Sequence, residues 1–138
     1  MKVSRILFPA LLLAAFSLNG LALAHEGSHT GVSFAKPLDG EVVPAEFRVE
    51  MSVNGMVVQP AGEVVKGAGH HHLIIDGDCI PKGATVPKDA THMHFGKGQT
   101  WTTLHLTPGD HTLTLQFANG LHQSYGREWC HTIHVTVE

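Results

Sequence analysis

The sequence predicts an all-β fold, namely an immunoglobulin-like antiparallel β-sandwich of about seven strands, with a small β-barrel as the alternative. Apolar and polar residues alternate with a period of two through much of residues 25–138, as in strands that bury one face. Turn-forming pairs such as Asp39-Gly40 and Asn119-Gly120 separate these segments. No segment shows the 3.6-residue apolar period of an amphipathic helix.

Three segments alternate most clearly, and four weaker ones complete the set. The clear strands are expected at residues 45–54, 111–118 and 129–137, and the weaker ones at residues 32–34, 56–59, 70–76 and 101–106. In the first of these, Phe47, Val49 and Met51 share one face. The connection from Gly77 to Gln99 is long for a compact domain, and such connections are often functional.

The first 24 residues have the features of a secretory signal peptide. A short basic start is followed by an apolar run at residues 6–18 and by Ala22-Leu23-Ala24, a small-x-small cleavage site. The apolar run is short and interrupted, so it does not suit a bilayer span. We therefore expect a signal peptide at residues 1–24 and one β-sandwich domain at residues 25–138, periplasmic or secreted and without a membrane span after cleavage.

Charge and cysteine content narrow the possible partners. Cleavage would remove Lys2 and Arg5, which leaves seven basic and twelve acidic residues and a formal charge of −5. Such a chain lacks the basic surface of a nucleic-acid-binding protein.

Cys79 and Cys130 are expected to form a disulfide, because paired cysteines in exported chains usually do. A thiolate metal ligand or a redox pair is less favoured, since neither cysteine lies in a C-x-x-C motif.

Histidine is the dominant compositional signal, because all twelve histidines lie in residues 25–138. Three of them, His70, His71 and His72, open a predicted strand. His70 and His72 share one face, while His71 lies on the more apolar face and is expected to point into the core. A single inward histidine is usually a hydrogen-bonded core residue. Three in succession favour metal binding, since unpartnered buried imidazoles are costly.

A second histidine group lies further along the chain. His92 and His94 project the same way in an extended chain, which suits chelation of one ion, and His122 follows the Asn119-Gly120 turn. If the later strands form a simple meander, His111 lies at the same end as His70, and this second group gathers at the other end as a separate half-site. An extra strand through residues 92–95 would merge the two groups. Both arrangements are open.

Other residues are candidate additional ligands or neighbours of the site. His71 and His111 could act as further ligands or as hydrogen-bond partners of ligands. Cleavage after Ala24 would make His25 the N-terminal residue, which can chelate copper through its amino group and ring. Met93, with Met51 and Met56, could supply thioethers to copper(I). Asp76 is the acidic residue closest to the first histidine group in the sequence.

Several motifs resemble an uncharacterised family of exported bacterial domains, catalogued as domain of unknown function 4399. They are KPLDG at residues 36–40, GHHHLIID at residues 69–76, H-x-HFGKGQT at residues 92–100 and PG-x-HTLTLQFANG-x-H at residues 108–122. The family usually has Asp at the position of Asn119. The resemblance implies an exported β-sandwich with a recurring histidine set, and it implies no activity. His25 also gives a weaker likeness to periplasmic copper-carrier sandwiches.

The leading hypothesis is a periplasmic histidine-rich protein that binds copper, or next zinc, for storage, delivery or buffering. Its expected ligands are His70, His72, His92, His94 and His122, and copper is preferred because imidazole-rich sites bind it most tightly among the divalent ions. One alternative is a mononuclear-metal enzyme with an open position for water or oxygen. Another is a metal-free interaction module whose histidines titrate near pH 6.5. No catalytic residue is assigned.

Overall fold

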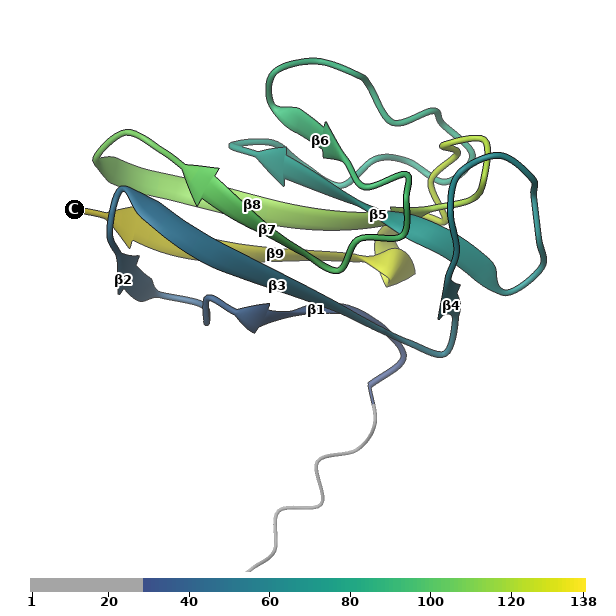
Figure 1. The fold of residues 1–138 in the computed structure, drawn as a ribbon, viewed down its shortest axis with the longest axis horizontal. Coiled ribbons are helices and arrows are strands. Elements are labelled where there is room, and N and C mark those ends of the chain that lie inside the picture. Colours follow the sequence, from purple (N-terminus) through teal and green to yellow (C-terminus); the bar gives the residue numbers. More distant parts are fainter. Residues whose placement is uncertain (1–28) are drawn as a thin grey trace, which may run out of the picture.

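The computed structural model describes residues 29–138 as an all-β structure, which confirms the predicted fold class (Figure 1). The strands are β1 (Gly31–Lys36), β2 (Glu41–Val43), β3 (Glu46–Asn54), β4 (Val57–Val58), β5 (Ala68–Ile75), β6 (His92–His94), β7 (Trp101–His105), β8 (Gly109–Ala118) and β9 (Cys130–Val137). A short 3₁₀ helix, η1 (Arg127–Trp129), precedes β9. None of the helical segments in residues 29–138 has the length and apolar character of a membrane span. The predicted signal peptide and His25 lie outside the described residues.

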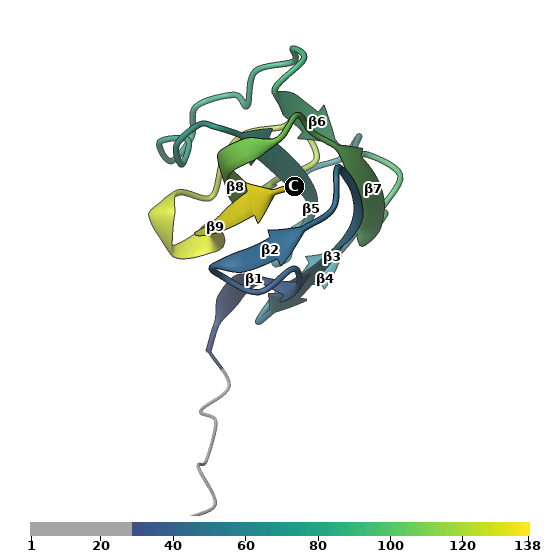
Figure 2. The ribbon, with the colours of Figure 1, turned by 90° about the vertical axis from the view of Figure 1, so that its left-hand side faces the viewer.

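Two sheets enclose the core. The first has the order β1-β3-β7, and the second has the order β2-β9-β8-β5-β4, with β6 paired to β5 as well. The second sheet curls, so that strands surround the core when the molecule is seen end-on (Figure 2). The pairings β2–β9 and β4–β5 are parallel, so the arrangement is not purely antiparallel as expected.

The sequence did not predict β2, and it left β6 open as a possible extra strand. Each has only three residues, which is too short for an alternating pattern to stand out. The simple meander is wrong, because β7 pairs with β3 in the first sheet and leaves β5 to pair directly with β8. The β5–β8 register places His70 opposite Ala118 and Ile75 opposite Leu113, so His111 lies at the far end of the sheet from His70.

The alternating residues build the core between the sheets as the period-two pattern predicts. Phe47, Val49 and Met51 of β3 face the inner side of β5, β8 and β9. The buried members from those three strands are Leu73, Leu113, Leu115, Phe117, Ile133, Val135 and Val137. Burial of this apolar surface is the main stabilising contribution to the fold.

Strands β5 and β8 are also covered on their outer side, by the connection that follows β5. The outward side chains of β8 bind this connection: the Thr114 hydroxyl donates to the Gly77 carbonyl (2.8 Å), and the Gln116 side-chain carbonyl accepts from the Ile80 amide (3.0 Å). The predicted disulfide is present and joins Cys79 to Cys130 at the start of β9. The covering connection is therefore attached to the second sheet by a covalent bond and by partly buried hydrogen bonds.

Replacing both cysteines by serine should lower the free energy of unfolding by about 4 kcal/mol, because the bond closes a long loop in the unfolded chain. The separation that sets this value is 51 residues. Urea unfolding of the Cys79→Ser/Cys130→Ser variant, compared with the oxidised wild-type protein, measures the change. An unchanged urea midpoint would mean that the disulfide does not constrain the unfolded chain.

Candidate metal centre

Four histidines from three separate segments converge on the outer side of β5. His70 and His72 lie two residues apart on that side of β5. The short strand β6 pairs antiparallel with β5 and places His94 directly opposite His72. His122 comes from the loop after β8, beyond the point where His70 pairs with Ala118. The extra strand through residues 92–94 thus merges the two histidine groups into one cluster.

The four rings lie close enough to share one ion. One ring nitrogen from each of His70, His72, His94 and His122 lies within 4.8 Å of the other three. All six ring pairs are in contact, with centroids separated by 4.6 to 5.9 Å. Around a tetrahedral ion with nitrogen bonds of about 2.0–2.1 Å, neighbouring nitrogens lie about 3.3 Å apart. A small inward movement of the side chains would therefore complete such a shell.

The cluster is buried at one end and open at the other. His70 and His72 are fully buried, His122 is half-buried and His94 is exposed. The Nδ1 atoms of His70 and His72 have no hydrogen-bond partner, although both are shielded from solvent. His70 Nε2 and His122 Nδ1 lie 3.1 Å apart, and which atom donates depends on the tautomers. Buried unpaired nitrogens are costly, and a bound metal ion is one way to satisfy them.

The loop that carries His122 is held by Asn119. The Asn119 side-chain carbonyl accepts from the amides of Leu121 and Gln123, and its backbone carbonyl accepts from the His122 amide. His122 has a φ of +65°, in the left-handed region that few side chains adopt. Its carbonyl accepts from the Val86 amide of the covering connection (2.9 Å). Two segments thus fix His122 over His70.

Gly96 makes room for the ring of His94. A Cβ atom built at Gly96 would overlap the His94 ring, so any other residue there would displace the imidazole. Neither Gly96 nor Asn119 was assigned a role in the site from the sequence. The signal for Asn119 is the Asn-Gly pair that marked a turn, whereas the need for Gly96 depends on the ring of a neighbour two residues away.

Burial lowers the pKa values of three of the cluster histidines, His70, His72 and His94. Desolvation, followed by the charges of the neighbouring histidines, lowers the pKa of His70 to about 4 and that of His72 to about 3. Burial also lowers the pKa of His94, with smaller contributions from His122 and Lys88. Metal ions bind the neutral imidazole, so these shifts reduce competition from protons above about pH 5.

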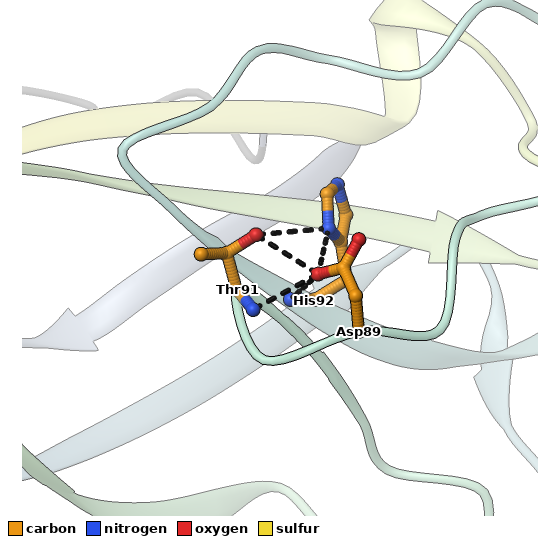
Figure 3. Close-up of polar contacts among 3 residues, drawn as sticks. All are labelled: Asp89, Thr91 and His92. Atoms are coloured by element: carbon orange, nitrogen blue, oxygen red, sulfur yellow. Dashed lines mark hydrogen bonds and ion pairs between the residues drawn. The ribbon is translucent and has the colours of Figure 1, made fainter.

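His92, the fifth predicted ligand, lies outside the cluster. Its Nδ1 is 2.7 Å from the Asp89 carboxylate, which also accepts from the amide and hydroxyl of Thr91 (Figure 3). The hydrogen bond to His92 is the main reason that the pKa of Asp89 is lowered to about 2. His92 therefore stabilises the turn that leads into β6.

Two further candidates point into the core, away from the cluster. His71 is fully buried on the inner side of β5, with its ring centroid 5.0 Å from that of Phe117, as the alternation predicts. Met93 alternates with His92 and His94 in β6 and packs against the core, where Met51 and Met56 also lie. None of these residues lies beside the four histidine rings.

Asp76 and His111 form a separate pair at the far end of β8. His111 Nδ1 is 2.8 Å from the Asp76 carboxylate, and its Nε2 is 2.9 Å from the Thr107 carbonyl. The hydrogen bond to Asp76 is the main reason that the pKa of His111 is raised. Burial alone would raise the pKa of Asp76, but hydrogen bonds from His111 and from the Thr112 amide lower it. Both ring nitrogens of His111 are engaged, which indicates a structural role.

The metal-free protein should lose stability as the pH falls from about 6.5 to about 4. In the unfolded chain, His70, His71 and His72 have the ordinary histidine pKa of about 6.5. In the folded chain, the pKa values of these residues are about 4, 4 and 3. Because the unfolded state then binds more protons, acid favours unfolding. Urea midpoints of the chelator-treated protein, measured at pH 7, 6, 5 and 4.5, test this expectation.

His71→Leu should reduce that pH dependence, whereas the same measurement on His105→Gln, which alters an exposed histidine, serves as the control. A urea midpoint that does not change between pH 7 and pH 5 in the wild-type protein would contradict the burial of neutral imidazoles in the folded state.

Comparisons with known proteins agree with the motifs that carry the histidines. Residues 49–138 match the family described as Domain of unknown function (DUF4399), a range that includes the whole cluster. No curated protein and no solved structure is significantly similar to the chain. Because the match spans well over half of the sequence, the chain belongs to the DUF4399 family.

Proposed function

We propose that this protein is an exported metal-binding protein that holds one divalent transition-metal ion at His70, His72, His94 and His122. The observation that carries the proposal is the convergence of four ring nitrogens within 4.8 Å on a site where two buried Nδ1 atoms lack partners. Storage, delivery or buffering of the ion is the task that suits such a site. The disulfide supports export, because disulfides persist in oxidising compartments such as the periplasm.

Copper is the preferred ion and zinc is the second choice. Imidazole binds both, and copper(II) has the highest affinity in the divalent first-row series. The methionines expected to serve copper(I) lie in the core, so the cluster offers nitrogen ligands alone. This donor set favours the divalent state of copper over the monovalent one, which soft thioether ligands select.

A mononuclear-metal enzyme is the second candidate function. It is favoured by a pocket of ≈190 Å³ beside the cluster, lined by His72, His94 and His122 among others. An open side at a metal is typical of catalytic centres, where water or substrate completes the shell. Asp76, the acid considered as a base for this chemistry, is instead bound to His111 and Thr112 and lines a different pocket.

His94→Ala should weaken metal binding by at least one to two orders of magnitude, because even changes to residues that only orient ligands cost about 10–100-fold. Titration of residues 25–138 carrying His25→Ala, which removes the N-terminal copper chelate, with Cu²⁺ and with Zn²⁺ against a competing chelator should show one ion per chain. The order of the two affinities tests the choice of copper over zinc. The nitrogen couplings in the electron paramagnetic resonance spectrum of the copper form report the number of imidazole ligands.

Two neighbours of the ligands provide matched controls. His92→Ala removes the other histidine of β6, and His71→Leu removes the histidine between His70 and His72 on the opposite side of β5. Both variants should still bind one ion per chain, and each should lose less affinity than His94→Ala does. Equal affinity of wild type and His94→Ala for both ions, or no binding by the wild type, would overturn the proposal. The second result would favour the metal-free, pH-responsive module.

A further inference from the structure

The histidine cluster forms one wall of a pocket. The pocket has a volume of ≈190 Å³ and is lined by His72, Thr85, Val86, Pro87, Lys88, His94 and His122. His70 does not reach it, since this ring lies fully buried at the back of the cluster. An ion held by the four rings would therefore have protein on one side and this pocket on the other.

The remaining walls combine apolar groups with a single cation. Val86 is buried and Pro87 follows it, and together they make this side of the pocket apolar. Lys88 is the one lysine or arginine in the lining, and no carboxylate lies among these residues. The pocket is smaller than the 300–1,000 Å³ typical of drug-sized ligands, so it suits a small molecule.

Lys88 has no acidic partner among residues 29–138. The ion pairs of this part of the chain involve Arg48 and three histidines, but no lysine. The adjacent acid, Asp89, is turned toward Thr91 and His92 and accepts four hydrogen bonds there (Figure 3). The Lys88 ammonium is therefore left beside the pocket, close enough to His94 to act on it electrostatically.

We infer that a metal ion bound by the four histidines accepts a fifth ligand from the side of the pocket, and that a short-chain carboxylate binds there between the ion and the Lys88 ammonium. This inference rests on the proposed function. Four neutral imidazoles leave a divalent ion with its full charge, so an anion is the ligand that this site attracts. One carboxylate oxygen would bind the ion and the other would face Lys88, while Val86 and Pro87 contact the alkyl end.

The test uses copper-loaded residues 25–138 carrying the same His25→Ala change, and propionate is the probe. The visible absorption and electron paramagnetic resonance spectra of the copper should change with propionate concentration and saturate at one anion per copper. Propionamide, which has the same shape without the charge, should produce no change at the same concentrations. Lys88→Met should weaken propionate binding by about fivefold, as expected for loss of one partly exposed ion pair, and should leave copper affinity unchanged.

Lys66→Met is the matched control, because Lys66 is exposed and does not line the pocket. It should bind propionate as the wild type does. Copper spectra that do not respond to propionate would overturn the inference and leave the metal-binding proposal intact. Propionate binding that Lys88→Met does not weaken would overturn the role of Lys88. Failure of the wild type to bind copper and zinc would overturn both proposals.

Discussion

Burial of β5 on both of its sides is the constraint on which the rest of the structure depends. A strand with one solvent-exposed face could expose every second side chain, but seven of the eight residues of β5 are buried. One side joins the core through His71 and Leu73, and the other carries His70 and His72. The imidazoles of β5 are shielded from water. His71 packs against Phe117 with both ring nitrogens unpaired, whereas the unpaired Nδ1 atoms of His70 and His72 belong to the histidine cluster, where a bound ion would satisfy them.

The cover over β5 and β8 is built from loops rather than from a third sheet. Loops carry many backbone polar groups, and a buried loop is stable when these groups are satisfied. The Gln116 side chain of β8 forms several of these hydrogen bonds. It accepts from the Ile80 amide and donates to the carbonyls of Gly126 and Trp129. Ser124 donates to the Ile80 carbonyl. The same layer helps to place His122 over His70, because its Val86 amide donates to the His122 carbonyl.

The electrostatics of the cluster follow from this arrangement. Four rings within contact distance cannot all carry a positive charge, and burial further disfavours protonation. One nitrogen of each ring lies near a common point, with the covered side at His70 and the open side at His94. Asp89 holds His92 apart from this group, so one of two equivalent histidines in β6 supports the turn while the other joins the cluster.

The sequence by itself determined the all-β class, the inward and outward sides of the longer strands and the disulfide, and it identified histidine as the residue type of the candidate site. Each of these depends on local pattern or on residue chemistry, such as the alternation of Phe47, Val49 and Met51. Local pattern also predicted that His71 would point into the core, on the side of β5 opposite to His70 and His72, because side chains alternate in any extended segment.

Only the tertiary structure decided which histidines meet. His92 and His94 have the same spacing and residue type, and the choice between them comes from the position of Asp89 and from the β5–β6 register that sets His94 opposite His72. The pairing of β5 with β8, which brings His122 to His70, arises because β7 joins the other sheet. Such pairings link residues far apart in the chain, and a period of two specifies which side a residue faces without specifying its neighbour across the sheet.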